Sequence, residues 1–368
     1  MNKIERKEEF NTTEVTISHS KPRLNVIILT HMRSGSTFVG NIFNLNPDVF
    51  YLFEPVNHLR NVVYGDRYLG EWSALDEKTK DAYKINFSDM LKDIFTCGFE
   101  RNNTFKNVFP DWLRKSKAGV LAWRTPKTEF TKEGVRKICN SRKITVVKIM
   151  QTRLPEGTGI RELQRVCNSE PNKFECLIIH LVRDPRAVLS SAVHHKFFLP
   201  FGPKRKIITL KNTPHGGKEI IRNNARILCS LVEENLNYMN LEMSNWFERR
   251  YILVRYEDTA INLLTTALRM YNFTGLPMAT SISRWIIEGK LPGIRNPTPE
   301  FQTSTRTGEN IDRSWRFKLS TSQVSEFEEA CFTLMYMMGY ISINGSERIL
   351  HNTSQKLWTD KIPFPFPQ

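Results

Sequence analysis

Short runs of consecutive apolar residues alternate along the chain with longer stretches in which apolar residues recur at helical spacing. The apolar runs are rich in β-branched residues and predict strands over residues 25–30, 49–53, 144–149, 177–182 and 251–254. The helical spacing predicts helices over residues 37–45, 81–97, 131–139, 157–167, 218–240 and 260–272. Continuous apolar strands that alternate with helices are typical of an α/β fold with a mainly parallel sheet, in which helices cover both faces.

Polar segments flank and interrupt this pattern. Residues 1–23 are charged and show no hydrophobic period, so they read as a tail or stem. The basic and aromatic segment 195–217 and the proline-rich end 362–368 both read as surface chain. The first of these is compatible either with a wall of an acceptor cleft or with an ordinary exposed loop. No repeat at a fixed period occurs, which favours one elaborated domain.

Composition narrows the function classes. Of the 368 residues, 40% are hydrophobic and 25% charged, which allows a sizeable core and argues against global disorder. Lysine and arginine outnumber aspartate and glutamate by 53 to 38, and the resulting charge of +15 attracts polyanions. The chain has no known nucleic-acid-binding motif, and its aromatic and basic residues do not alternate in a base-stacking pattern, so a glycan or a nucleotide-type cosubstrate fits better than nucleic acid.

The cellular compartment is ambiguous from sequence. No stretch approaches the roughly 18 apolar residues that span a bilayer, and the N-terminus lacks the apolar centre of a signal peptide, which indicates the cytosol. Six cysteines and six N-x-S/T sequons instead favour a lumenal glycoprotein whose membrane anchor is missing. The cysteines are Cys97, Cys139, Cys167, Cys176, Cys229 and Cys331, and the sequons begin at Asn11, Asn86, Asn102, Asn272, Asn344 and Asn352. Neither CxxC nor HExxH spacing occurs, so no metal site is expected.

A loop of glycine and hydroxyl residues follows the first predicted strand, with the sequence Arg33-Ser34-Gly35-Ser36-Thr37. A helix begins after it, and the unpaired N–H groups of a helix N-terminus bind phosphate. Gly35 lets the backbone approach a ligand closely, and the guanidinium of Arg33 suits oxyanions. The loop lacks the GxxxxGK[ST] pattern of ATPases and GTPases. Taken alone, these residues are equally compatible with a turn that only caps the helix.

A second candidate anion site follows the fourth predicted strand, in the run HLVRDPRAVLSS over residues 180–191. The strand places Arg183 at the carboxyl edge of the sheet, where ligands of open α/β sheets bind. Asp184 and Pro185 then begin a helix, on which Ser191 lies about two turns from Arg183. In isolation, the run is also compatible with a structural pair between Arg183 and Asp184.

The residues around these sites resemble a known family. Residues 33–58 (RSGSTFVGNIFNLNPDVFYLFEPVNH) resemble the 5′-phosphosulfate-binding region of the Golgi carbohydrate sulfotransferases, above all the galactose/N-acetylgalactosamine/N-acetylglucosamine 6-O-sulfotransferase group. The run over 180–191 is similar to that family's 3′-phosphate-binding motif. The resemblance extends from about residue 24 to 343, and it implies a sulfotransferase domain over 24–343 between an N-terminal tail and a C-terminal tail (344–368). The implied fold is a P-loop-NTPase-like α/β fold whose mainly parallel sheet is flanked by helices.

The resemblance also implies an activity. It is the transfer of a sulfuryl group from 3′-phosphoadenosine 5′-phosphosulfate (PAPS) to a sugar hydroxyl, the 6-hydroxyl of Gal, GalNAc or GlcNAc, on a glycan or glycosaminoglycan in the Golgi lumen, without a metal. The implied donor contacts are Arg33, Ser34, Gly35, Ser36 and Thr37 at the 5′-phosphosulfate, Arg183 and Ser191 at the 3′-phosphate, Tyr256 near the adenine, and Arg306, Trp315 and Arg316 in a closing C-terminal loop. Tyr256 as a plain strand end and Trp315 as a core residue are the alternatives.

Catalysis of this transfer requires a base for the sugar hydroxyl. We expect Glu54 to be this base, because it ends the second strand and matches the family's FEP glutamate, although a structural partner of an arginine is the alternative. His58 is the second candidate, since histidine titrates near neutral pH. Lys148, at the end of the third predicted strand, matches a family lysine that is followed by arginines, and it is a candidate to stabilise the leaving group. Three residues later the chain has Gln151 where relatives usually have arginine, while Arg153 remains, so acceptor contacts are expected to differ.

Cysteine pairing is a further hypothesis from the resemblance. Cys229 and Cys331 fall near cysteines of relatives, Cys167 and Cys176 flank a short insert, and Cys97 with Cys139 completes the set, although other pairings stay open. Buried free thiols are the alternative in a cytosolic chain.

Two other functions compete with a sulfotransferase. One is a non-catalytic protein that binds polyanions such as glycosaminoglycans, which predicts salt-sensitive binding. The other is a nucleotide kinase-like P-loop enzyme, which the missing Walker lysine disfavours.

Overall fold

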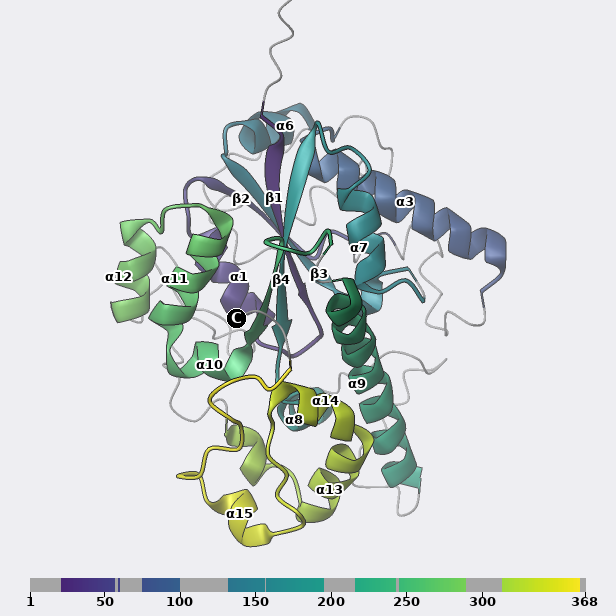
Figure 1. The fold of residues 1–368 in the computed structure, drawn as a ribbon, viewed down its shortest axis with the longest axis vertical. Coiled ribbons are helices and arrows are strands. Elements are labelled where there is room, and N and C mark those ends of the chain that lie inside the picture. Colours follow the sequence, from purple (N-terminus) through teal and green to yellow (C-terminus); the bar gives the residue numbers. More distant parts are fainter. Residues whose placement is uncertain are drawn as a thin grey trace, which may run out of the picture.

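An all-parallel, five-stranded sheet forms the centre of the protein (Figure 1). The structure is a computed structural model and describes residues 21–56, 59, 75–99, 132–155, 157–194, 216–242, 245–288 and 313–364. The strands are β1 (Arg23–Thr30), β2 (Val49–Phe53), β3 (Ile144–Met150), β4 (Phe174–Val182) and β5 (Tyr251–Arg255). All five predicted strands are present, with small extensions at their ends.

Helices follow the strands in alternation. The α-helices among the described residues are α1 (Ser36–Asn44), α3 (Glu77–Phe95), α6 (Lys132–Asn140), α7 (Ile160–Cys167), α8 (Pro185–His194), α9 (Gly216–Glu242), α10 (Tyr256–Ile261), α11 (Leu263–Thr274), α12 (Thr280–Glu288), α13 (Thr321–Ala330), α14 (Phe332–Met338) and α15 (Glu347–His351). Short 3₁₀ turns are η4 (Gln151–Arg153) and η7 (Ser314–Phe317).

The strand order is β2-β3-β1-β4-β5, so β1 lies at the centre of the sheet. Its last residue, Thr30, is in register with Met150 of β3 on one side and Leu181 of β4 on the other. The chain builds one half of the sheet through β2 and β3 and then crosses to the other half. The order therefore reverses at β1, and ligands of such sheets bind outside the strand ends at this switch point.

Helices cover both faces of the sheet (Figure 1). On β1, Ile27 and Leu29 face a core shared with α3, α7 and α9, whereas Val26 and Ile28 face a second core shared with α1, α11 and α12. Burial on both faces explains why the strands read as continuous apolar runs and not as alternating patterns.

Two predicted element boundaries are wrong. The helix expected over 260–272 is divided in two, because the side chain of Asn262 accepts a hydrogen bond from the N–H of Thr265 and begins α11 there. Of the segment expected as a C-terminal tail from 344, residues 344–364 belong to the packed structure, since Leu350, Leu357 and Trp358 are buried in the same core as the sheet.

Three disulfides join the six cysteines, as the resemblance suggested. They are Cys97–Cys139, Cys167–Cys176 and Cys229–Cys331, with sequence separations of 42, 9 and 102. No cysteine is free. In the part of the chain that the structure describes, no helix combines the length and apolar character needed to cross a bilayer.

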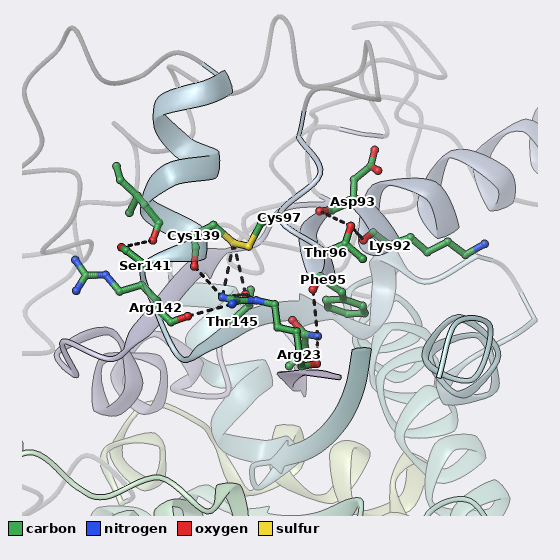
Figure 2. The surroundings of a disulfide bond; sticks show 12 residues. Arg23, Lys92, Asp93, Phe95, Thr96, Cys97, Cys139, Ser141, Arg142 and Thr145 are labelled. Carbon is green, nitrogen blue, oxygen red and sulfur yellow. Dashed lines mark hydrogen bonds between the residues drawn. A yellow bond between two sulfur atoms is a disulfide. The ribbon is translucent and has the colours of Figure 1, made fainter. Parts of the chain in front are cut away.

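The Cys97–Cys139 disulfide lies beside the start of the central strand (Figure 2). The guanidinium of Arg23 donates to the carbonyl oxygens of Cys139 and Arg142 at 2.9 and 3.0 Å and to the hydroxyl of Thr145 at 3.1 Å. Burial lowers the pKa of Arg23, and these acceptors satisfy its donors. Arg23 thereby joins β1, α6 and β3 at the amino ends of the strands, opposite the carboxyl edge of the sheet.

Removing the disulfides one at a time should destabilise the protein in order of loop length. A crosslink reduces the entropy of the unfolded chain more when it closes a longer loop. We expect the Cys97→Ser/Cys139→Ser pair to lose about 4 kcal/mol of unfolding free energy and Cys167→Ser/Cys176→Ser about 2.5 kcal/mol. Urea denaturation of both variants measures the difference, and a larger loss for the shorter loop would contradict the expectation.

Candidate functional site

The loop between β1 and α1 has the backbone geometry of an anion-binding turn. Arg33 and Gly35 have positive φ angles of 63° and 83°, and Gly35 is the N-cap of α1. The hydroxyl of Ser34 is 2.6 Å from that of Thr30, which fixes the loop to the end of β1. No acidic residue lies in the first turn of α1, so the unpaired N–H groups and the helix dipole there favour an anion.

The loop between β4 and α8 meets this turn, although some 150 residues separate the two in sequence. Arg183 donates from Nη1 to the carbonyl oxygen of Arg33 at 3.0 Å. Arg33 in turn donates from Nε to the hydroxyl of Ser191 on α8 at 2.9 Å. Because β1 and β4 are neighbours in register, the two candidate anion loops come together at one sheet edge. The structure thus joins the two arginines of the predicted site through the guanidinium of Arg183 and the backbone carbonyl of Arg33.

The ring of Tyr256 packs between these loops. It follows directly after β5, and the guanidinium carbon of Arg183 lies 4.4 Å from its ring centroid. A Cβ added to Gly35 would overlap the Tyr256 ring. Glycine is therefore required at position 35 both by the positive φ and by this close approach. The observed contacts make Tyr256 a support for both loops, and its adenine contact stays a prediction.

A buried ion pair lies on the other side of the loop. Lys148 at the end of β3 is 1% exposed, and its Nζ is 3.0 Å from Oε1 of Glu54 at the end of β2. The same Nζ donates to the hydroxyl of Thr37 at 3.4 Å and lies 3.5 Å from the Phe53 ring centroid. Burial lowers the pKa of Lys148 to about 8, while the charge of Glu54 opposes this shift.

Glu54 is suited to a reactive role. Its side chain is 19% exposed and is therefore partly accessible to solvent. It also has a positive φ of 50°, a strained conformation for a non-glycine residue. Among the described residues, Lys148 is an ion-pair partner of its carboxylate. His58, the other candidate base, lies outside the described residues.

Trp315 and Arg316 of η7 are both buried. Trp315 is buried in the core, where the guanidinium of Arg186 lies 4.7 Å from its ring centroid. Arg316 is 1% exposed and donates to the carbonyl oxygens of Leu350, Gln355 and Ile349 at 2.8, 2.9 and 2.6 Å. The side chain of Arg316 thereby holds η7 against α15, and the donor contacts expected of Trp315 and Arg316 stay a prediction. Arg306 lies outside the described residues.

Sequence reasoning missed a buried polar chain beneath the site. Gln151 does not extend into solvent, and its Nε2 lies 2.7 Å from Nε2 of His180, whose Nδ1 lies 2.8 Å from the Tyr251 hydroxyl. Burial lowers the pKa of His180 to about 3 and that of nearby His31 to about 4, the latter also through the charge of Arg183. Both imidazoles are therefore neutral near pH 7. A histidine inside an apolar strand run was the available sequence signal.

Cations dominate the chemistry that this site offers. Arg33 and Arg183 provide fixed positive charge beside a helix N-terminus, and Lys148 adds a third cation that can lose its proton near neutral pH. No group of three or more metal-ligating His, Cys, Asp or Glu side chains occurs in the described ranges. The arrangement can hold a ligand with two separated anionic groups next to one carboxylate.

Comparison with known proteins finds a family model, curated proteins and solved structures that are similar to this chain. Residues 166–339 match the model of a family described as a sulfotransferase domain. The chain is 28% identical to carbohydrate sulfotransferase 1 of Homo sapiens over 94% of its own length and 85% of that protein. Carbohydrate sulfotransferase 6 of Homo sapiens is 27% identical over 86% of this chain and 81% of that protein. The solved sulfotransferase domain from the Synechococcus PCC 7002 olefin synthase has a TM-score of 0.42 and 17% identity over 87% of this chain and 97% of that domain.

Gly35→Ala should destabilise the protein through contact with Tyr256. A Cβ at position 35 is strained at positive φ and overlaps the ring, and we expect a loss of about 2 kcal/mol of unfolding free energy. Chemical denaturation of Gly35→Ala in the wild-type and Tyr256→Ala backgrounds forms a double-mutant cycle. The loss should be smaller in the Tyr256→Ala background, and equal losses would show that the ring does not require glycine.

Proposed function

We propose that this chain, which carries a sulfotransferase domain and is similar to carbohydrate sulfotransferases over most of its length, transfers a sulfuryl group from PAPS to a hydroxyl of a glycan. The observation that carries the proposal is the bond network between the two anion loops, in which Arg183 donates to Arg33 and Arg33 donates to Ser191. PAPS has phosphate at its 3′ position as well as a 5′-phosphosulfate. A donor with two separated anionic groups therefore requires two such loops.

The residues of the site fit that donor. The turn at 33–37 offers unpaired N–H groups at the start of α1 to the 5′-phosphosulfate, with the guanidinium of Arg33 beside them. Arg183 and Ser191 form the side of the site proposed for the 3′-phosphate. Tyr256 holds the two loops at a fixed separation through its contacts with Gly35 and Arg183. This arrangement orients the donor before reaction and lowers the entropy cost of the transfer.

The transfer itself is an in-line displacement at sulfur. The oxygen of the sugar hydroxyl forms a new bond to sulfur as the bond to the bridging phosphate oxygen breaks, and the hydroxyl proton passes to the Glu54 carboxylate. Charge develops on the leaving phosphate, and Lys148 and the N–H groups of the turn stabilise it. Oε1 of Glu54 and Nζ of Lys148 are 3.0 Å apart, so the proposed base and this cation lie next to each other at the carboxyl edge of the sheet.

The acceptor and the compartment are finer parts of the proposal. The carbohydrate sulfotransferases among the relatives support a glycan acceptor, and we assign the 6-hydroxyl of Gal, GalNAc or GlcNAc. Three disulfides form in oxidising compartments, which supports the Golgi lumen. A non-catalytic polyanion-binding protein would need no buried pair of Glu54 and Lys148, so the site favours the enzyme.

The decisive assay combines donor and acceptor selectivity. Purified protein is incubated with radiolabelled PAPS and a panel of desulfated glycosaminoglycans, and the products are analysed as disaccharides. Binding of PAPS and of ATP is compared in parallel. Label transfer with selective PAPS binding supports the proposal, whereas salt-sensitive polyanion binding without transfer would establish the non-catalytic alternative.

Arg33→Ala and Arg183→Ala should each abolish PAPS-dependent transfer while the protein stays folded. Each change removes a charged partner of a donor anion, a loss of roughly 2–3 kcal/mol or more in transition-state binding. Arg226→Ala, at an exposed position of α9, is the matched control. Turnover and circular dichroism are measured together, and near-normal turnover of either site variant would exclude the proposed donor site.

Glu54→Gln should lower turnover with little effect on donor affinity. Gln keeps the shape of the side chain but cannot accept the hydroxyl proton, so we expect kcat to fall by about 10²- to 10⁴-fold. The dissociation constant of PAPS should change by less than about threefold, because the donor anions contact other residues. Single-turnover kinetics and calorimetry measure the two quantities. A loss of donor affinity with unchanged kcat would make Glu54 a structural residue.

A further inference from the structure

A buried carboxylate lies directly behind the proposed 3′-phosphate loop and takes no part in the transfer. Glu257, in the first turn of α10, is 1% exposed. Its Oε1 accepts a hydrogen bond from the backbone N–H of Asp184 at 3.1 Å, and its Oε2 accepts one from the Tyr340 hydroxyl at 2.9 Å. One side chain therefore joins the end of β4, the end of β5 and the segment after α14, next to both Arg183 and Tyr256.

Charged and titratable groups of the surrounding elements act on Glu257 directly or are linked to it through neighbouring ion pairs. They are Arg183, Asp184 and Arg186 of the β4–α8 segment, Arg255 and Asp258 around the β5–α10 junction, Glu328 of α13, and Tyr340. Within this set, Arg186 forms ion pairs with Asp184 and Glu328 at 2.7 Å each. Arg255 forms one with Asp258 at 2.9 Å. Arg183 is thus the cation whose charge Glu257 shares with an incoming ligand.

We propose that Glu257 is a positioning residue that couples donor affinity at Arg183 to the protonation of its own carboxyl group. The inference rests on the proposed function, since it requires an anionic donor group at Arg183. With a neutral Glu257, the positive charge of Arg183 acts fully on the 3′-phosphate. With an ionised Glu257, the carboxylate competes with the phosphate for the same charge and repels it. Both forms retain the contacts that shape the loop.

The pKa of Glu257 lies near neutral pH. Burial and the negative charge of Asp184 raise its pKa to about 7, and the positive charge of Arg183 partly opposes this. A bound phosphate adds negative charge nearby and raises this pKa further, so donor binding favours uptake of a proton. By reciprocity, raising the pH through this range ionises Glu257 and weakens donor binding.

The test uses 3′-phosphoadenosine 5′-phosphate as the probe and the ratio of two affinities as the readout. Calorimetry on the full chain gives the dissociation constants of wild type and Glu257→Gln at about pH 5.5 and about pH 8.5, on either side of the Glu257 titration. The ratio cancels titration of the ligand phosphates, which is common to both proteins. We expect equal affinities at the lower pH and about three- to tenfold tighter binding by Glu257→Gln at the higher pH.

The outcomes distinguish a failure of the coupling through Glu257 from a failure of the proposed donor site. If the probe binds wild type but the affinity ratio is the same at both pH values, the coupling through Glu257 is wrong and the donor site stands. If wild type does not bind the probe at either pH, the proposed function fails and this inference fails with it. Glu248→Gln, an exposed substitution of the same kind, should behave as wild type at both pH values.

A second variant keeps the test independent of the folding of Glu257→Gln. Tyr340→Phe removes a hydrogen bond to the ionised carboxylate and so raises the pKa of Glu257. Relative to wild type, the pH at which probe affinity falls should move upward in Tyr340→Phe, with equal affinities at about pH 5.5. An unchanged midpoint in a folded Tyr340→Phe protein would overturn the proposal.

Discussion

The simultaneous pairing of β1 with β3 and β4 is the constraint on which the site depends. This pairing places three strand ends side by side, and the residues that follow them inherit that proximity. Arg33 after β1 reaches Ser191 and receives a hydrogen bond from Arg183 only because β4 is in register with β1. Lys148 reaches Thr37 because β3 is the other neighbour. A change in strand order would separate these groups even if every local element were kept.

Buried charge is the second organising feature, and it is compensated locally. Arg186 and Arg255 are almost completely buried, and each combines a carboxylate partner with a backbone carbonyl from the C-terminal segment, Ile341 and Met338 respectively. Unpaired burial of such groups would cost several kcal/mol each. These bonds join the C-terminal segment to the strand ends next to the anion loops. That segment consequently supports the site from behind.

Burial also changes the acid–base properties of the site. It lowers the pKa of Lys148 to about 8 and raises that of Glu257 to about 7, so the pKa values of a lysine and a glutamate both lie near neutral pH. The two histidines beneath the sheet edge remain neutral for the same reason. The proposed transfer and the proposed pH coupling both follow from desolvation acting on groups that ordinary sequence patterns present as simple charges.

Local sequence patterns predicted the secondary-structure elements and the positions of the two candidate anion loops, because apolar runs and loop composition are local properties. Arg33, Arg183 and Glu54 were predicted at strand ends and lie there. Long-range packing set what the sequence left open: the strand order, the ion pair of Glu54 with Lys148, and the burial of Arg316 against the C-terminal segment. Gln151 and Glu257 likewise gained their roles only from partners distant in sequence. Long-range pairing depends on which apolar surfaces pack together, and no local pattern encodes that choice.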